Sequence, residues 1–492
     1  MSHPYDLVIV GMGSGGMVAS EFAASLGLEV AVVERARVGG DCLWTGCVPS
    51  KALLASAKVA HHLRTADRWG LPALDTLDID TSLVWKRIRD TQAQIAATDD
   101  NPERYRSLGV EVIQGDARLT GPHSVEVDGR TLSTRYILLC TGSRPARPPV
   151  EGLEEAGYLT SENIFELERA PRTVVAIGGG PIAIEMAQGL RRLGLGVTVL
   201  QRGDGILTKD EPELVALLTE VLVEEGIDLQ LGVAVDRVTV EDGHKVVHCH
   251  QGGRQGGREV RFAAEELLVG VGRKPNVEGL GLEAAGVTVG QRGIEVDDRM
   301  RTNVASIYAS GDVAGRYLFT HSAGHESVRA VRDMFFPGKG TVSDVVPWCT
   351  FTDPELAHAG LTEAEARRIH GNKVRVRRLD LAHSDRARAD GDSVGRIMAV
   401  CGPSDRLLGA HILGPHAGEM IHELAYVVSR RGRLSELSKL VHVYPTLSTS
   451  IGQLASESSF DNARRFGWLT TLSRLEETVR SRYTRAAQYI RR

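Results

Sequence analysis

The sequence predicts an α/β fold built around two Rossmann-like dinucleotide-binding domains. A short apolar strand at residues 5–10 runs into a G-x-G-x-x-G loop, which is followed by a helical segment and a second apolar strand at residues 30–33. The same pattern recurs from residue 174, which makes it an internal repeat. A chain of 492 residues is also too long for one core and fits about three domains.

The first loop is placed to bind a dinucleotide. Gly11, Gly13 and Gly16 let the backbone approach a pyrophosphate, whose charge faces the N-terminus of the following helix. Glu34 ends the second strand, where it can accept hydrogen bonds from a ribose. A lone G-x-G-x-x-G is weak evidence, but strand, loop, helix, strand and acid in this order are strong evidence.

The second copy has the same spacing. Its strand at residues 174–177 precedes a glycine loop, a helix through Glu185 to about Leu193, and a strand at residues 197–200. Gln201 lies as far beyond the first glycine of its loop as Glu34 does in the first copy. Two loops imply two dinucleotide cofactors. The binding positions in the second loop are Gly178, Gly180 and Ala183.

Two cysteines, Cys42 and Cys47, follow the first nucleotide-binding unit. This spacing cannot be bridged across a regular helix, so it needs a distorted first turn, which Gly46 and Pro49 suit. A helix N-terminus stabilises a thiolate and lowers its pKa. The hypothesis is a redox-active disulfide. The alternative is a pair of buried structural cysteines, because free cysteine packs as a small hydrophobe.

Residues 39–51 read G-G-D-C-L-W-T-G-C-V-P-S-K, which resembles the signature of the pyridine nucleotide-disulfide oxidoreductases. That family includes glutathione reductase, dihydrolipoamide dehydrogenase and mercuric reductase. The resemblance covers about residues 4–460. Its other matches are Gly40 in the signature, the turn Thr141-Gly142, the G-x-G-R-x-P-N segment containing Gly272, the second flavin fingerprint containing Gly311 and Asp312, and F-T-D-P-E at residues 351–355.

The resemblance implies FAD in the first Rossmann-like domain, NAD(P)H in the second, and a C-terminal α+β dimerisation domain. It further implies an obligate two-fold homodimer in which the partner chain completes each active site. The expected domains are 1–150 (FAD-binding, first part), 151–275 (NAD(P)H-binding), 276–344 (FAD-binding, second part), 345–462 (dimerisation) and 463–492 (a basic amphipathic helix).

Residue roles follow from the same resemblance. Electrons pass from the nicotinamide through the flavin into Cys42–Cys47. Cys47 would be nearer the flavin, as a charge-transfer thiolate, and Cys42 would attack the substrate. Lys51 and Glu185 match a buried ion pair beside the flavin, although two unrelated surface charges are the alternative. Asp312 would hold the ribityl or pyrophosphate region, or else be a turn residue.

The second loop predicts a preference for NADPH over NADH. Gln201 removes the carboxylate that would repel a 2′-phosphate, and Arg202 can pair with that phosphate. Ala183 in place of the third glycine matches the G-x-G-x-x-A variant common in NADPH-using members. The alternative for Arg202 is a surface arginine without a cofactor role.

The chain departs from the family near its C-terminus. Disulfide-reducing members have H-x-H-P-T-x-x-E, in which the second histidine and the glutamate form an acid–base dyad. Here Tyr444 replaces that histidine and Thr449 the glutamate, while His442 keeps the first histidine. A phenol of pKa about 10 shuttles protons poorly at neutral pH compared with an imidazole of about 6.5. Quinones, dyes or metal ions therefore become more plausible acceptors than disulfides. Tyr444 could still orient a substrate, and His442 could substitute as a base.

Composition limits the other possibilities. Hydrophobic content of 42% and 25% charged residues are ordinary for a soluble globular protein, and a net charge of −5 argues weakly against nucleic acid. There is no basic segment before the first apolar run and no long apolar stretch, so a cytoplasmic, reducing compartment is expected. The C-terminal basic helix is expected to dock on the protein rather than on a membrane.

Two function classes remain open: an NAD(P)H oxidoreductase acting on a small-molecule acceptor, and a flavin-bearing redox sensor without significant turnover. The intact residues Cys42, Cys47, Lys51 and Glu185 favour the enzyme. A mercuric reductase-like activity meets one objection. That subfamily uses a further cysteine pair at its C-terminus, and no cysteine follows Cys401 here.

Overall fold

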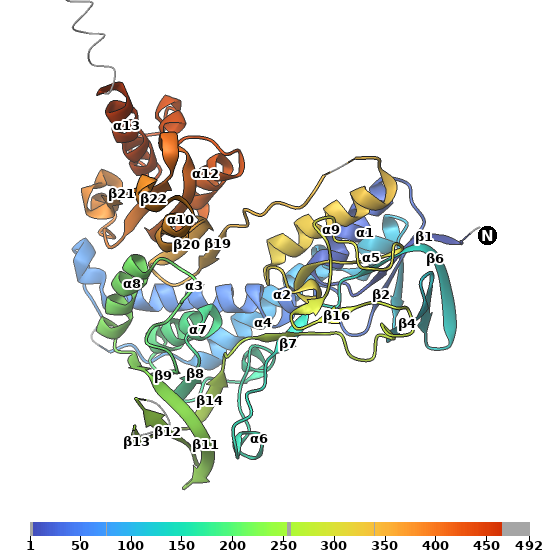
Figure 1. Ribbon diagram of the computed structural model, residues 1–492. Coiled ribbons are helices and arrows are strands. Elements are labelled where there is room, and N and C mark those ends of the chain that lie inside the picture. Colours follow the sequence, from blue (N-terminus) through green and yellow to red (C-terminus); the bar gives the residue numbers. More distant parts are fainter. Residues whose placement is uncertain (1–2, 75, 253–256, 339, 465–492) are drawn as a thin grey trace, which may run out of the picture. The chain divides into compact units, whose positions relative to one another are not determined.

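The structure is a computed structural model that describes residues 3–74, 76–252, 257–338 and 340–464. The chain forms two compact units, Met1–Asp353 and Pro354–Arg492 (Figure 1). The expected C-terminal basic helix lies outside the described residues, apart from the end of the helix that precedes it. In the described part of the chain, no helix is long and apolar enough to cross a membrane.

The first sheet of unit 1 is parallel at its centre. Its strand order is β3-β2-β1-β6, continuing into antiparallel β5 and β4, and β18 pairs with β6 (Figure 1). Val10 pairs with both Val33 and Leu139, so three strands end level at one edge. The elements are β1 (Tyr5–Val10), α1 (Ser14–Ser25), β2 (Val30–Glu34), β3 (Glu111–Gln114), β4 (Ala117–Gly121), β5 (Ser124–Val127), β6 (Arg130–Leu139), β18 (Ile307–Ala309) and α9 (Thr320–Phe335).

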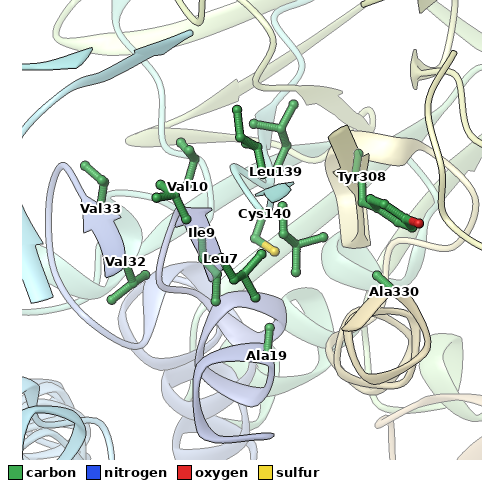
Figure 2. Packing of buried hydrophobic residues seen from close by; sticks show 14 of the residues in the cluster. Leu7, Ile9, Val10, Ala19, Val32, Val33, Leu139, Cys140, Tyr308 and Ala330 are labelled. Atoms are coloured by element: carbon green, nitrogen blue, oxygen red, sulfur yellow. The ribbon is translucent and has the colours of Figure 1, made fainter. Parts of the chain in front are cut away.

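This sheet is buried on both faces, which explains its continuous apolar strands. Leu7, Val8 and Ile9 of β1 have no exposed surface. Figure 2 shows Cys140, which follows β6, among these residues with Tyr308 of β18 nearby. Burial raises the pKa of the Cys140 thiol to about 11, so this cysteine packs as a hydrophobe.

The second parallel sheet has the order β10-β9-β8-β14. Its elements are β8 (Thr173–Ile177), α7 (Pro181–Arg192), β9 (Gly196–Gln201), α8 (Pro212–Glu224), β10 (Asp228–Leu231) and β14 (Glu266–Val269). An antiparallel sheet of β11 (Val233–Glu241), β12 (His244–Gln251) and β13 (Arg258–Ala264) follows α8 and β10 in sequence. The two parallel sheets, each with its glycine loop, confirm the predicted α/β fold with two Rossmann-like domains.

Four α-helices lie between β2 and β3 in the described part of the sequence, and one of them packs on the first helix of the second sheet, α7. They are α2 (Gly40–Trp44), α3 (Cys47–Arg64), α4 (Thr81–Thr98) and α5 (Pro102–Ser107). Helix α3 packs on α7 (Figure 1), and Gly189 of α7 faces Leu53 and Leu54 of α3. A Cβ at Gly189 would lie 2.7 Å from Leu53 Cδ2 and 3.2 Å from Leu54 Cδ2. The separation of the two helices therefore depends on a glycine here.

Strands of unit 2 pair antiparallel in the order β20-β23-β22-β21. The helix α10 begins with a complete capping box between Thr362 and Glu365. The elements are β20 (Glu355–Gly360), α10 (Glu363–His370), β21 (Arg375–Asp380), α11 (Asp385–Ala389), β22 (Arg396–Cys401), β23 (Leu407–Gly414), α12 (Ala417–Ser429) and α13 (Thr449–Arg464). Shorter strands and helices of unit 1 are β7 (Ser143–Pro145), α6 (Leu153–Ala156), β15 (Arg273–Pro275), β16 (Val289–Gly290), β17 (Gly293–Ile294) and β19 (Trp348–Thr350).

We expect Gly189→Ala to destabilise unit 1 by about 1–3 kcal/mol, because the new methyl group would force Leu53 out of a close-packed site. Comparison of urea midpoints for this variant and the wild type measures the effect. Gly121→Ala is the control, since a Cβ there meets nothing within 4 Å and the substitution should be nearly neutral. Equal stability of the two variants would show that the helices can move apart freely.

Candidate active site

The two cysteines lie on two consecutive helices. Cys42 belongs to α2, and Cys47 is the first residue of α3. The expected distorted first turn is instead a break, because Gly46 has φ −123° and ψ −103° and precedes α3 as its N-cap. A Cβ at Gly46 would lie 3.0 Å from the Asp41 carbonyl oxygen, so the chain doubles back closely on α2. This return brings the two sulfur atoms within hydrogen-bond reach of each other.

The pair is present as two thiols with unequal acidity. The hydrogen bond from Cys42 lowers the pKa of Cys47 to about 6, although burial of the thiol raises this pKa and so opposes the shift. Thr320 Oγ1 lies 3.2 Å from Cys47 Sγ, and its hydrogen bond and the charge of Lys51 lower the same pKa further. The bond to Cys47 and burial raise the pKa of Cys42. At neutral pH the arrangement favours a Cys47 thiolate with Cys42 as its hydrogen-bond donor.

The predicted pair of Lys51 and Glu185 is formed. Lys51 Nζ lies 2.8 Å from Glu185 Oε2, and the glutamate side chain is only 8% exposed. The backbone N–H of Phe351 donates to the other oxygen, Oε1, at 2.8 Å. Lys51 Nζ also lies 4.4 Å from the centroid of the Phe351 ring, within the range of a cation–π contact. Both oxygens of the buried carboxylate therefore have partners, as a buried charge requires.

The first glycine loop fits a dinucleotide. Gly11 has φ +97°, and a Cβ there would lie 2.5 Å from the Cys140 carbonyl oxygen. A Cβ at Gly16 would lie 1.9 Å from the Gly11 oxygen, and one at Gly40 would lie 2.8 Å from the Gly13 Cα. No side chain could be accommodated at these positions, so the backbone itself lines the loop, as an approaching pyrophosphate requires.

Glu34 closes the other side of this loop. Its carboxylate accepts hydrogen bonds from the backbone N–H groups of Met12, at 2.6 Å, and Ala36, at 2.8 Å. These bonds hold the carboxylate at the end of β2, next to the loop that would bind the nucleotide. The donor set and the glycine contacts fit the FAD that the sequence implies, with Glu34 at the ribose position.

Asp312 lies beside the redox motif. Burial raises the pKa of its carboxyl group, which accepts a hydrogen bond from Ser143 Oγ. Arg273 Nε is 3.6 Å from Asp312, and Arg273 Nη2 is 3.0 Å from Asp41 Oδ2, so one guanidinium joins the flavin fingerprint to the cysteine segment.

The turns beside Asp312 are fixed by backbone contacts. Thr141 Oγ1 donates to the Asn276 carbonyl at 2.8 Å, and Asn276 N donates to Gly142 at 3.0 Å. Gly272, with φ +127°, accepts from Ala146 N at 2.9 Å. Gly311 has φ +74°, and a Cβ there would lie 2.9 Å from the Ala323 Cβ, so this position has no room for a side chain.

The second loop repeats the construction of the first. A Cβ at Gly178 would lie 2.5 Å from the Gly270 oxygen, whereas Gly180 is open. Ala183 is fully buried and packs against Gly270. This is where the structure accommodates the alanine of the predicted G-x-G-x-x-A variant.

The two residues expected to read the nucleotide's ribose differ in their surroundings. Gln201 turns toward its own loop and donates to the Gly205 carbonyl at 3.1 Å. Arg202 is exposed and has no hydrogen bond or ion pair with the described residues. Its guanidinium is therefore available to a ligand phosphate.

Unit 2 contains the residues that replace the dyad. Tyr444 is 69% exposed, and its hydroxyl donates to Asp385 Oδ2 at 3.0 Å, which raises the pKa of the phenol. Thr449 Oγ1 donates to the Val443 carbonyl at 3.2 Å, so it does not bind Tyr444. His442 Nε2 lies 3.0 Å from Glu423 Oε1, and the histidine side chain is only 9% exposed. The three side chains have separate partners and form no joint acid–base group.

Two contacts of this site were not predicted. Thr320 is far from the cysteines in sequence, and no motif marked it. Arg273 was visible only as the arginine of the G-x-G-R-x-P-N segment, whose partner Asp41 is an acid within the cysteine signature. Lys51, in contrast, lies within the cysteine signature and could be identified from it.

Comparisons with known proteins agree with this geometry. The sequence profile described as "Pyridine nucleotide-disulphide oxidoreductase" matches residues 5–327, and the profile of the dimerisation domain of the same family matches residues 346–455. The dimerisation domain indicates a homodimer.

Individual relatives resemble nearly the whole chain. A dihydrolipoyl dehydrogenase of Thermus scotoductus is 36% identical over 92% of this chain and 96% of its own. A mercuric reductase of Bacillus cereus is 33% identical over 92% of this chain and 71% of its own. A solved structure, the Cu(II) complex of the HOCl-induced flavoprotein disulfide reductase RclA from Escherichia coli, has a TM-score of 0.80 and 26% identity over 93% of this chain and 99% of its own.

Profiles that cover most of the chain, relatives above 30% identity and two dinucleotide loops flanking a cysteine pair lead to one conclusion. This chain is a pyridine nucleotide-disulphide oxidoreductase, a member of the family of flavin enzymes that use NAD(P)H.

Proposed function

We propose that the enzyme oxidises NADPH and passes two electrons through FAD and the Cys42–Cys47 pair to a small acceptor that needs no proton from a His–Glu dyad, such as a quinone or a metal ion. The observation that most supports this choice is the Tyr444 hydroxyl, which donates to Asp385 at 3.0 Å and has a raised pKa. A phenol with a raised pKa keeps its own proton near neutral pH, so it cannot act as a base there.

In this proposal the two cysteines have different roles. When bound, FAD supplies hydride acceptance and two-electron transfer to the cysteine pair. Cys47 is the thiolate on the flavin side, where Lys51 and Thr320 stabilise its charge. Cys42 is the thiol that meets the acceptor. Each site is completed by the partner chain of the homodimer.

The acceptor class follows from the proton balance. Reduction of a disulfide breaks an S–S bond and expels a thiolate, and an acid that protonates this leaving sulfur makes the cleavage faster. A metal ion takes electrons without a proton: one Hg(II) ion takes both electrons of the cysteine pair, whereas two Cu(II) ions take one each. A quinone takes two electrons and can take its two protons from water. Loss of the dyad therefore slows the first reaction more than the other two.

Metal ions are acceptors of particular interest. The matched structure described as a Cu(II) complex and the mercuric reductase relative both suggest metal substrates for this chain. In this proposal the metal ion reacts as a substrate at Cys42 and Cys47, because thiolates bind soft metal ions and these cysteines carry the electrons. Cu(II) and Hg(II) are the two metal ions to test, because one matched structure is described as a Cu(II) complex and one relative as a mercuric reductase.

A flavin sensor without turnover is the competing function. A steady-state assay of NADPH oxidation with a quinone, Cu(II), Hg(II), lipoamide and glutathione disulfide separates the two. Turnover with a quinone or Cu(II), and little with either disulfide, supports the proposal. Failure of every acceptor would support the sensor.

The missing dyad gives a first prediction. The double variant Tyr444→His, Thr449→Glu should reduce lipoamide at least about tenfold faster than the wild type, because acid–base catalysis contributes roughly 10²–10⁴-fold. Quinone reduction should change little. Tyr444→Phe is the matched control, since it removes the hydroxyl without supplying a base. If the wild type already reduces lipoamide or glutathione disulfide as fast as typical family members, the proposal is wrong.

The acidity of Cys47 gives a second prediction. In the reduced enzyme, alkylation of Cys47 by iodoacetamide should reach half its maximal rate near pH 6 and fall below that pH as the thiolate is protonated. Lys51→Met and Thr320→Val should each move the midpoint upward, because each removes a group that lowers this pKa. Peptide mapping by mass spectrometry follows each cysteine separately. A wild-type midpoint in the ordinary range, about 8–9, contradicts the assignment.

Cofactor choice gives a third prediction. The wild type should have a higher kcat/KM for NADPH than for NADH, and Arg202→Ala should lower the NADPH value by about tenfold or more, because a charged hydrogen bond to the 2′-phosphate is lost. The NADH value should not change, which makes it the internal control. A wild-type preference for NADH, or an unchanged NADPH value in Arg202→Ala, would exclude the predicted role of Arg202.

A further inference from the structure

Residues 351–353 contact two helices that approach the redox site, α7 and α3. On α7, Gln188 Oε1 accepts from the Asp353 N–H at 2.8 Å, and Gln188 Nε2 donates to the Asp353 carbonyl at 2.8 Å. One turn earlier, Glu185 accepts from Phe351 N at 2.8 Å, and one turn later Arg192 binds Asp353. On α3, Lys58 binds Asp353 as well. The segment is therefore held along two helices by its own backbone and by one carboxylate.

The Asp353 carboxylate belongs to a four-charge network. Arg192 Nη1 lies 2.7 Å from Asp353 Oδ2, and Lys58 Nζ lies 3.0 Å from Asp353 Oδ1. Arg192 Nη2 also lies 2.6 Å from Glu225 Oε1. Arg192 is 6% exposed, Glu225 11% and Asp353 20%, so these three charges are largely removed from water, whereas Lys58 is 40% exposed. Two cations and two anions balance, and loss of one anion would leave Arg192 incompletely paired.

The cations also affect the protonation of Asp353. Burial by itself would raise the pKa of this carboxyl group, but Arg192 and Lys58 more than compensate, and the net pKa lies below the ordinary value. The carboxylate is therefore charged throughout the neutral range, and the network persists at the pH values at which the enzyme would be assayed.

A short path leads from this network to the thiolate. Phe351, two residues before Asp353, donates to Glu185 and places its ring against Lys51 Nζ. Lys51 lies one turn after Cys47 on α3 and lowers the pKa of that thiol. A Cβ at Gly189 would lie 2.7 Å from Leu53 Cδ2, so α7 packs directly on α3, and the segment joins two helices that are already in contact.

We propose that Asp353 is a positioning residue for the redox site: by holding residues 351–353 on α3 and α7, it keeps Phe351 against the Lys51–Glu185 pair and keeps Lys51 beside Cys47. This inference rests on the proposed role of Cys47 as the flavin-side thiolate. Asp353 contacts neither the cysteines nor the second glycine loop, and it acts through Phe351.

The test measures the Cys47 alkylation midpoint together with kcat and KM for NADPH in Asp353→Asn. The variant keeps the size of the side chain and removes its charge. We expect the Cys47 midpoint to rise and kcat to fall about tenfold, because Lys51 is displaced. The KM for NADPH should stay within about twofold of the wild-type value, because the second glycine loop is unchanged. Asp353→Glu, which keeps the charge, should restore part of the loss.

A double-mutant cycle separates positioning from general destabilisation. In the Lys51→Met background, Asp353→Asn should not shift the Cys47 midpoint further, because the two residues act on the same path. Asp90→Asn is the matched control, since Asp90 forms an exposed ion pair with Lys86 and its loss should change none of these quantities. If Asp353→Asn does not fold, Lys58→Met removes the most exposed cation of the network and should shift the midpoint in the same direction by less.

Two results would overturn the inference. The first is an unchanged Cys47 midpoint in folded Asp353→Asn, or in Lys58→Met if only that variant folds. The second is an equal shift of the midpoint by Asp353→Asn in the presence and in the absence of Lys51. A different result identifies failure of the proposed function. If wild-type Cys47 titrates in the ordinary thiol range, its role as the thiolate is wrong, and the positioning role fails with it.

Discussion

A thiolate at Cys47 is stable near neutral pH only if hydrogen-bond donors and positive charge surround it, and much of unit 1 supplies these. Thr320 reaches the sulfur from the start of α9, and Lys51 contributes its charge from the next turn of α3. Asp41 opposes both because its negative charge raises the same pKa. Arg273 binds that carboxylate at 3.0 Å, which balances the opposing charge within the cysteine segment.

The two glycine loops have the same close contact at their first position and different packing at their third. In each, the first glycine approaches a carbonyl oxygen so closely that a Cβ would lie 2.5 Å from it, which brings the loop against the end of a neighbouring strand. The third position differs. Gly16 lies against its own loop and admits no side chain, whereas Ala183 fits because its methyl group packs on Gly270. The two loops therefore share their first two glycines and differ in residue type at the third position.

Much of this could be predicted from the sequence. The apolar runs that became β1, β2, β8 and β9 lie within one or two residues of their expected positions, because strands buried on both faces have no competing pattern. The Lys51–Glu185 pair was predicted from the signature and is formed. The break between α2 and α3 was not, since glycine and proline indicate irregular backbone without specifying its conformation. The contact of Thr320 with Cys47 spans 273 positions and that of Arg192 with Asp353 spans 161, which no local pattern can detect.

The closeness of the two cysteines also affects how the reduced enzyme withstands oxidants. A thiolate with a pKa of about 6 is the form that peroxides attack, and the product is a sulfenic acid. Such a group on Cys47 would lie within hydrogen-bond reach of the Cys42 thiol, and their condensation expels water and forms a disulfide. That disulfide is the oxidised form of the proposed catalytic cycle, which NADPH would reduce again. The same spacing that allows electron transfer would thus divert chemical damage into a state that the enzyme itself can repair.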